Sequence, residues 1–325
     1  MIFVDVQSTD PYYNLALEEY FFNQTDEDCF LLWQNYNTIV IGKYQNAIEE
    51  ISAKYVKDND IRVVRRLSGG GAVYHDMGNY NFTFITKQTE ENSFNFEHFT
   101  RHIVDVLQKL GVKAEFSSRN DLVIEGRKFS GNSQYIKKDR ILHHGTLLFD
   151  SRLEVLVNAL NVSDAKIKSK AIKSIHERVT NIKEYLSEDF TLEQFKDALK
   201  NHITQSSPDV KEYVLMEEDK QAIEKLRNEK YATWQWNYGT APKCNIEKKG
   251  KCDSGMVQAM IDVEEGRVKN IKFYGDFFVS GNLTEFEQDF AGKEYREESL
   301  REPVKKLSSA IVGMDPEWLL QLLVY

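Results

Sequence analysis

The 325-residue sequence is poor in cysteine and proline, with three and five of them, and it contains no long hydrophobic run. The cysteines, Cys29, Cys244 and Cys252, are odd in number and predict no disulfide framework. The longest apolar runs, near residues 30–33 and 39–41, are far shorter than the ~20 residues that cross a bilayer. Residues 1–10 lack the basic and apolar segments of a secretory signal. We therefore expect a protein of the reducing cytoplasm that does not contact a membrane.

An excess of positive charge is also missing, since the formal net charge is -9. Nucleic-acid binding is therefore not expected, because the neutralisation of phosphates requires a basic surface. A local basic pocket for a small anion stays compatible with this charge. The composition, 41% hydrophobic and 29% charged, is typical of a globular protein with a full core. The length exceeds what one core usually holds, so we expect one large and one smaller domain.

The order of the periodic segments predicts an α+β fold, with a mixed, largely antiparallel sheet and packed helices. Asp10 followed by Pro11 is typical of a helix start. Alternation over residues 79–86 predicts a half-buried strand. Further strands are expected at 29–34, 38–43, 61–66, 121–125, 128–136 and 141–149, and helices at 94–110 and over most of 152–227. Because strands do not alternate strictly with helices, a doubly wound parallel sheet is not favoured.

A second, smaller α+β domain is expected at the C-terminal end. Residues 247–251 are charged and lack apolar anchors, which predicts a linker. Residues 255–263 and 267–273 flank a turn and predict a hairpin, and helices should follow from about residue 297. Pro303 and Pro316 are expected to start or break these helices. The predicted domains are 1–247 and 248–325.

The most informative segment runs from Arg65 to Asp76 and contains three consecutive glycines, Gly69 to Gly71. Glycines let the backbone approach a ligand and present its N–H groups, and arginines add permanently charged donors. Arg65 and Arg66 with these glycines therefore predict an anion-binding loop, against the alternative of a hairpin loop with surface arginines. No Gly-Lys-Ser/Thr follows, which excludes a P-loop, and no helix pattern follows as in a dinucleotide fingerprint.

Three later segments carry further candidates. Lys128 lies early in a predicted strand and could place a point charge beside developing negative charge, while Asp121 could hold Mg²⁺. Taken singly, Lys128 and its neighbour Arg127 are better explained as solvent-facing charges beside a turn. His143 and His144 point to opposite faces of a strand, so at most one enters a given pocket and no zinc site is expected. The lysine-rich residues 166–173 are a solvated face, or a segment that closes over a nucleotide or docks an acidic partner.

In order and spacing, these segments resemble the lipoate–protein ligase family over essentially the whole chain. The matching segments are 65–76, 120–122, 128–131, 143–148, 174–181 and 236–242. The resemblance implies a catalytic domain related to that of biotin–protein ligases, followed by an accessory domain. It also implies two steps, in which lipoate and Mg-ATP give lipoyl-AMP and pyrophosphate, and an acceptor lysine then displaces AMP. The implied acceptors are apo lipoyl domains of 2-oxoacid dehydrogenase E2 subunits or the glycine-cleavage H protein.

The resemblance also assigns residues. Lys128 would be the catalytic residue, touching both the lipoyl carbonyl and the α-phosphate, and Asp121 would hold the metal. Residues 166–175 would form the adenylate-binding loop. Candidates for lining the lipoyl tail are Trp33, Tyr36 and Tyr44. The nucleotide, phosphate and pocket contacts would be Arg66, Ser68, Gly70, Gly71, Ala72, Val73, Tyr74, His75 and His144.

Three other functions are compatible with parts of the sequence. An octanoyl transferase of related fold would need an activated cysteine, and no cysteine lies inside a matched segment. A biotin ligase would carry an arginine- and glycine-rich loop of the GRGR type, which is absent. A non-catalytic lipoate- or acyl-adenylate-binding protein is opposed by the presence of Arg66, Lys128 and Asp121 together. Whether octanoate also serves as substrate stays open.

Overall fold

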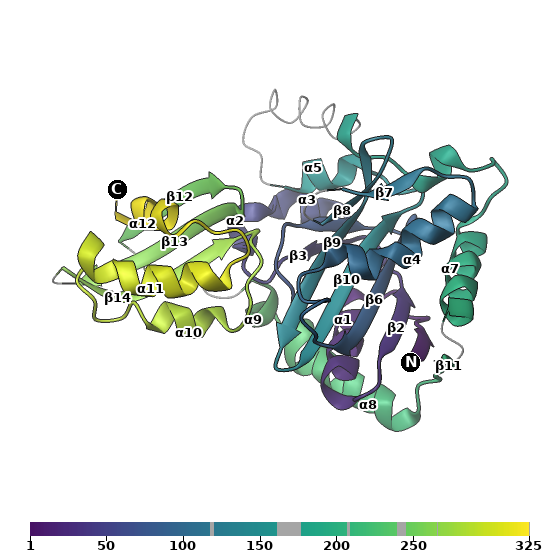
Figure 1. The fold of residues 1–325 in the computed structure, drawn as a ribbon, viewed down its shortest axis with the longest axis horizontal. Coiled ribbons are helices and arrows are strands. Elements are labelled where there is room, and N and C mark those ends of the chain that lie inside the picture. Colours follow the sequence, from purple (N-terminus) through teal and green to yellow (C-terminus); the bar gives the residue numbers. More distant parts are fainter. Residues whose placement is uncertain (118–119, 161–176, 207–208, 239–244, 265, 325) are drawn as a thin grey trace. The chain divides into compact units, whose positions relative to one another are not determined.

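The computed structural model describes residues 1–117, 120–160, 177–206, 209–238, 245–264 and 266–324 (Figure 1). The chain forms two compact units. The first unit comprises Met1–Val40, Ile48–Arg65 and Val73–Asn237, and the second comprises Ile41–Ala47, Arg66–Ala72 and Tyr238–Tyr325. Within the N-terminal part of the chain, two short segments thus belong to the second unit, and one of them holds the three consecutive glycines.

The first unit is built on an eight-stranded sheet with the order β11-β1-β2-β6-β10-β9-β8-β7. The strand β1 pairs in parallel with β2 and β11, and the other neighbours are antiparallel. The predicted mixed, largely antiparallel sheet is therefore confirmed. The strands are β1 Ile2–Asp5, β2 Cys29–Trp33, β6 Asn79–Lys87, β7 Ala114–Phe116, β8 Asp121–Ile124, β9 Arg127–Lys137, β10 Arg140–Leu148 and β11 Lys211–Glu212.

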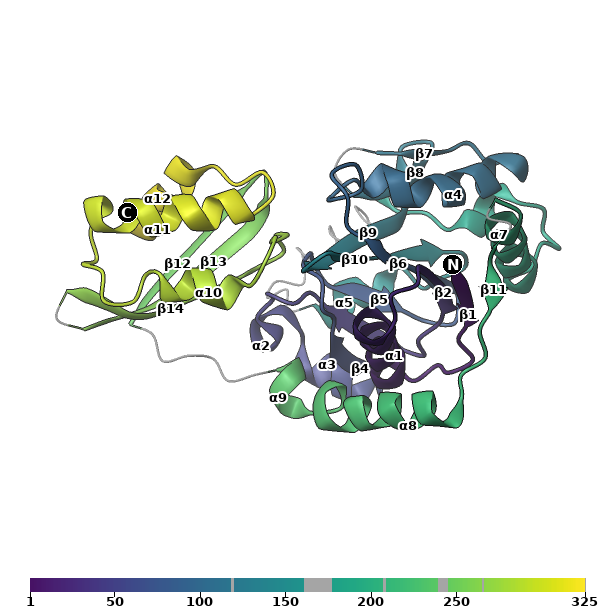
Figure 2. The ribbon, with the colours of Figure 1, turned by 60° about the horizontal axis from the view of Figure 1, so that its bottom comes forward.

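Helices cover both faces of this sheet. Figure 2 shows α1 (Pro11–Gln24) and α8 (Glu217–Leu226) on one face, with α4 (Phe96–Lys109) and α7 (Leu192–Ser206) on the other. One hydrophobic cluster joins Phe82 and Phe84 to α4 and α7, and another joins Ile85 to α1 and α8. Seven of the nine residues of β6 are buried in consequence. The expectation of a half-buried strand here was wrong, because a second helical layer covers the face expected to meet solvent.

Local signals set the helix ends as predicted. The Asp10 side chain accepts a hydrogen bond of 3.2 Å from the Tyr12 N–H, and Pro11 opens α1. Asn95 caps α4 in the same way, accepting from the His98 N–H at 3.1 Å. Gly111, with φ of 83°, follows the end of α4 in the left-handed conformation that stops a helix.

Shorter elements complete the first unit. They are α3 Ala53–Asp58, α5 Glu154–Ala159, the 3₁₀ helix η1 Ile182–Tyr185, the π-helical turn η2 Arg227–Tyr231, α9 Trp234–Asn237, and a small sheet of order β4-β3-β5 with β4 Arg62–Arg65, β3 Thr38–Ile41 and β5 Val73–His75. The helix α2 spans Ala47–Glu50. The tract expected to be mostly helical over 152–227 also contains the strand β11. The lysine-rich segment 166–173 lies outside the described residues.

The second unit contains a three-stranded antiparallel sheet packed against helices. The expected hairpin is confirmed, since Ile261 lies opposite Ile271. A core that includes Phe273, Phe290 and Leu320 joins the sheet to the helices. The elements are β12 Ile246–Cys252, β13 Gly255–Glu264, β14 Arg267–Gly275, α10 Leu283–Gln288, α11 Glu297–Ala310 and α12 Pro316–Val324.

Two local predictions for this unit were wrong. The supposed linker 247–251 lies inside β12, an edge strand whose exposed and half-buried residues alternate. A Cβ on Gly250 would lie 2.9 Å from Leu322 and 3.0 Å from Trp318, so this glycine lets α12 approach the strand. Pro303 lies inside α11, where it is buried, although Pro316 does open α12. The domain boundary after residue 247 stays a prediction, but it would cut through β12.

Candidate functional site

The glycine-rich loop of the second unit is folded around the side chain of Arg66. The guanidinium is only 6% exposed, and its Nη2 donates to the carbonyls of Gly69 at 2.6 Å and Gly71 at 2.8 Å. Its Nε also donates to the Ser68 hydroxyl at 3.1 Å. A Cβ on Gly42 would lie 1.8 Å from the Gly70 carbonyl oxygen, so the loop takes this shape only beside a glycine. The predicted anion-binding loop is therefore compact, with its arginine bonded to the loop's own main chain.

Arg65, the other arginine of the predicted pair, holds a different segment. Its Nε donates to the Trp236 carbonyl at 3.0 Å and its Nη2 to the Asn237 carbonyl at 2.8 Å. The Trp236 indole N–H donates back to the Arg65 carbonyl at 2.9 Å. The matched segment that begins at Trp236 thus fastens α9 to β4, and Arg65 serves the fold of the first unit.

Lys128 and Asp121 form an ion pair on neighbouring strands of the first unit. The Lys128 Nζ lies 2.7 Å from Asp121 Oδ1, and the two side chains are 37% and 32% exposed. The Thr180 N–H donates to the Lys128 carbonyl at 2.9 Å, which ties the end of the matched segment 174–181 to the lysine. The structure therefore brings together two of the predicted residues and leaves both side chains partly exposed.

The two adjacent histidines separate as predicted. His143 is fully buried and stacks on Phe99, with ring centroids 4.7 Å apart, and burial lowers its pKa well below the usual value. His144 faces the other side of the sheet, where its Nδ1 lies 3.0 Å from Glu18 Oε1. Only His144 therefore remains a candidate for the pocket.

A row of buried polar side chains surrounds His144 and includes residues that the sequence analysis missed. Glu18 also accepts a hydrogen bond of 2.5 Å from the Thr83 hydroxyl, and Thr83 accepts one of 2.9 Å from the Trp33 indole. Glu18 is 3% exposed, so its burial marks it as unusual for a carboxylate. The available signal was a glutamate among Leu15, Leu17 and Phe21 on one helix.

His75 belongs to a second buried polar group. Its Nδ1 lies 3.1 Å from the Asn35 amide nitrogen, and the Asn35 amide oxygen accepts from Asn14 at 2.9 Å. The adjacent Tyr74 hydroxyl donates to Asn37 at 2.9 Å and accepts from Arg152 at 2.8 Å, while burial raises its pKa. Asn14 and Asn35 were not predicted.

The three candidates for the lipoyl tail do not lie in one place. Trp33 is buried in the first unit beside Thr83, whereas Tyr36 is 55% exposed. Tyr44 belongs to the second unit and stacks on Phe277, with ring centroids 5.4 Å apart. Trp33 is therefore the one aromatic of the three that lines the buried polar row of the first unit.

The thiol of Cys29 is not activated. Cys29 is buried in β2, and desolvation raises its pKa to about 12. Cys252 lies in β12, and Cys244 lies outside the described residues. The described part of the chain also has no group of three metal-ligating side chains and no helix long and apolar enough to cross a membrane.

Known proteins resemble both parts of the chain. The family described as lipoyl protein ligase A/B catalytic domain matches residues 10–204, and the bacterial lipoate protein ligase C-terminus matches residues 241–323. Lipoate-protein ligase LplJ of Bacillus subtilis (strain 168) is 47% identical over 300 residues, which cover 91% of each chain.

Solved structures agree with this match. The crystal structure of P. falciparum LipL1 in complex with lipoate has a TM-score of 0.82 and 25% identity, and covers 99% of both chains. A crystal structure of lipoate-protein ligase A bound with ATP has a TM-score of 0.62 and 25% identity, and covers 73% of this chain and 98% of that one. The two family matches and the first of these structures span both units.

Proposed function

This chain belongs to the lipoate–protein ligase family, and on that premise we propose how its residues carry out the reaction. The enzyme joins lipoate to a lysine of an acceptor protein and uses ATP to do so. The lipoate carboxylate attacks the α-phosphorus of ATP, which forms lipoyl-AMP and releases pyrophosphate. The ε-amino group of the acceptor lysine then attacks the acyl carbon, and AMP leaves as the amide bond forms. The adenylate makes the acyl carbon reactive, so the protein needs no nucleophile of its own.

The observation that carries the proposal is the partly exposed side chain of Lys128 near the start of β9. We assign it the contact with the lipoyl carbonyl and the α-phosphate, where it stabilises negative charge in both transition states. The glycine-rich loop would bind the nucleotide and its phosphates through Arg66, Ser68, Gly70, Gly71, Ala72, Val73 and Tyr74. His75 and His144 would contact the substrate. In the loop as described, Arg66 shapes the main chain that would present these donors.

Asp121 is the candidate ligand for Mg²⁺. Its side chain is 32% exposed and paired with Lys128, and among the described residues it is not joined by two further ligating side chains. Mg²⁺ commonly takes one or two carboxylates and fills its other positions with phosphate oxygens and water, so a single carboxylate fits an ion that arrives with ATP. The ion would neutralise charge on the phosphates.

The acceptor and the compartment are also proposals. Apo lipoyl domains of 2-oxoacid dehydrogenase E2 subunits, or the glycine-cleavage H protein, present the lysine that the second step needs. A reducing cytoplasm suits a chain whose described cysteines, Cys29 and Cys252, are both free. We place the boundary between catalytic and accessory domains after Asn237 and before Ile246, which keeps β12 whole.

The test is lipoate-dependent release of pyrophosphate from Mg-ATP, with and without an apo lipoyl domain whose mass is followed. Release together with a mass gain of one lipoyl group supports both steps, and omission of lipoate is the blank. Lys128→Ala should abolish release while the protein stays folded, because the charge on the α-phosphate is then unopposed. A variant that releases pyrophosphate at the wild-type rate would remove Lys128 from the mechanism.

A second function, acyl transfer from an octanoyl carrier protein through a cysteine, is disfavoured by Cys29. A thiol with a pKa of about 12 holds almost no thiolate at neutral pH. Transfer from the carrier in the absence of ATP would nevertheless replace the ligase assignment.

A further inference from the structure

The strand β9 carries an extra residue immediately after Lys128. Its neighbour β8 pairs Asp121 with Gly131 and Leu122 with Ser130, but the next pair is Val123 with Lys128. Between these two pairs β8 advances by one residue and β9 by two, so Phe129 has no partner on β8. This is a β-bulge, a feature that re-aims side chains and is frequent next to active sites. Phe129 itself is fully buried in the core.

The bulge decides which way Lys128 points. In a regular strand, residues three apart lie on opposite faces, so Lys128 and Gly131 would face away from each other. Residues directly opposite across two strands share a face, and Asp121 and Val123 share one because they are two apart. The pairs Asp121 with Gly131 and Val123 with Lys128 therefore place the lysine on the face of Asp121 and Gly131.

The lysine side chain then lies over the backbone of Gly131. A Cβ at this glycine would be 2.9 Å from Lys128 Nζ, 3.1 Å from its Cε and 4.0 Å from Asp121 Oδ1. The close atoms are the end of a flexible side chain, and the backbone at Gly131 has no positive φ. Alanine therefore fits the local backbone and displaces only the ammonium. Glycine at this position is explained by the room it leaves for the lysine.

Two further contacts complete the placement of Lys128. Its carbonyl accepts the hydrogen bond from Thr180, and Val179 bridges to it in parallel, so its main chain is held from the side opposite to β8. The Asp121 carboxylate then holds the free end at 2.7 Å. The position of the ammonium is therefore limited by the held main chain of Lys128, by the space above Gly131 and by the Asp121 carboxylate.

We propose that Asp121 and Gly131 are positioning residues for Lys128, the carboxylate holding the ammonium and the glycine leaving the space in which it lies. The inference rests on the proposed role of Lys128 in adenylate formation. It gives Asp121 a function that acts through the lysine and that does not depend on its binding a metal. The function of Gly131 is to leave space for the Lys128 side chain, and this function does not depend on contact between Gly131 and the substrate.

The test compares Gly131→Ala, Asp121→Asn and the control Glu212→Gln, using the full chain. Glu212 forms a half-exposed ion pair of 3.2 Å with Lys200, far from Lys128 in the sequence and on β11. We expect kcat for lipoate-dependent pyrophosphate release to fall roughly 10- to 100-fold in the first two variants, because a displacement of about 1 Å can cost that much. In Gly131→Ala the KM for ATP and the Mg²⁺ half-saturation concentration should stay within about twofold of wild type. In Asp121→Asn the loss of kcat should persist at saturating Mg²⁺, and the control should match wild type.

A double-mutant cycle separates positioning from other roles. In the Lys128→Ala background, the residual release that remains measurable at high enzyme concentration should fall no further with Gly131→Ala, because the group that it displaces is gone. The midpoint of thermal unfolding should be unchanged in Gly131→Ala, and a crystal structure of this variant should show the ammonium moved away from residue 131. Full activity of Gly131→Ala, or equal losses in both backgrounds, would overturn the inference.

The dependence of the rate on Mg²⁺ concentration distinguishes a positioning role of Asp121 from a role as metal ligand. Recovery of Asp121→Asn to the wild-type rate at high Mg²⁺ would make this residue a metal ligand only and would overturn its positioning role. Absence of lipoate-dependent release in the wild-type protein would instead overturn the proposed function. An active wild type with an equally active Gly131→Ala leaves the proposed function in place and removes only the inference.

Discussion

The carboxylate of Asp219 joins three parts of the first unit, and its removal gives a sharp test of how they are held. It accepts hydrogen bonds from the hydroxyls of Tyr20 at 2.7 Å and Tyr213 at 2.8 Å, and from the Met216 N–H at 2.7 Å. The last bond caps the start of α8, while Tyr20 comes from α1 and Tyr213 from the segment after β11. Asp219→Ala breaks all three bonds at once.

The expected loss follows from the bonds removed. A helix cap contributes about 1 kcal/mol, and a hydrogen bond to a charged group about 1.5–3 kcal/mol when both partners are buried. Tyr20 and Tyr213 are half-buried and regain water, so each of their bonds counts for the lower part of that range or less. Asp219→Ala should therefore destabilise the first unit by about 2–4 kcal/mol, and Asp219→Asn by less.

Urea unfolding of the two variants, with hydrogen exchange along α8, measures this loss. Burial alone would raise the pKa of Asp219, but the hydrogen bonds from Tyr20, Tyr213 and Met216 lower it overall. The stability that these bonds supply is therefore present above the unfolded-state value near 4 and is lost as pH falls through the folded pKa. A loss below about 0.5 kcal/mol in Asp219→Ala at pH 7 would refute the reasoning, since it would equal an ordinary surface change.

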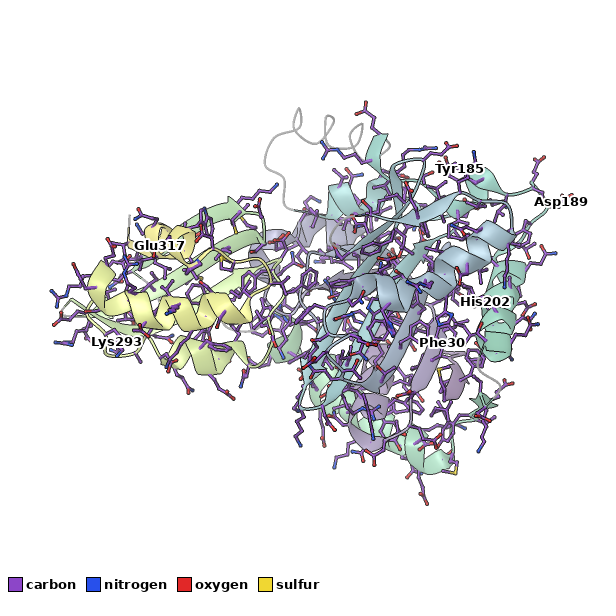
Figure 3. All side chains as sticks on the ribbon, in the orientation of Figure 1. Phe30, Tyr185, Asp189, His202, Lys293 and Glu317 are labelled. Atoms are coloured by element: carbon purple, nitrogen blue, oxygen red, sulfur yellow. The ribbon has the colours of Figure 1, made fainter. Side chains whose placement is uncertain are left out.

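Two further predictions concern the loop and a histidine pair. Gly42→Ala should raise the KM for Mg-ATP at least severalfold and lower the thermal midpoint, because its Cβ would lie 1.8 Å from the Gly70 carbonyl oxygen and the main chain must move; an unchanged KM would contradict this. Burial lowers the pKa of His102 on α4 and of His202 on α7, the latter labelled in Figure 3. The unfolded chain therefore protonates first, and stability falls below about pH 6.5. The double variant to glutamine should lose less stability between pH 7 and 5.5 in urea unfolding than wild type does, and an equal loss would contradict the assignment.

Local chemistry made part of the fold predictable. Asp10 and Pro11 define the start of α1 whatever the rest of the chain does, because the cap and the fixed φ act within one turn. The hairpin of the second unit was visible for a similar reason, since a turn between two apolar segments leaves few pairings. The register did not follow from the turn alone, because an irregularity between Asp262 and Val263 shifts it by one residue and places Ile261 opposite Ile271.

Features that depend on partners distant in sequence were not predictable. Residues 247–251 read as a linker because a charged edge strand exposes every second residue, and only α12 shows that the other face is covered. Glu18 reads as a surface residue of α1 until Thr83 and His144 are brought to it from β6 and β10. A sequence pattern indicates the apolar face of α1. It does not identify the hydrogen-bond partners of Glu18, which lie on strands 65 and 126 residues away.

The two predicted cations, Lys128 of the first unit and Arg66 of the second, show the same limit. Both were found from residue type and spacing, but the structure prepares them differently. Lys128 is held by a half-exposed carboxylate, and such pairs contribute only about 0–1 kcal/mol, so the ammonium can offer its other N–H groups to a phosphate or a carboxylate at small cost while it stays beside Asp121. Arg66 is buried, and each of its bonds to the Gly69 and Gly71 carbonyls costs about 1–3 kcal/mol if a carbonyl is left unpaired. Lys128 is therefore available to a ligand in the described conformation, whereas Arg66 acts first through the shape of the loop and contacts a phosphate only by exchanging those bonds.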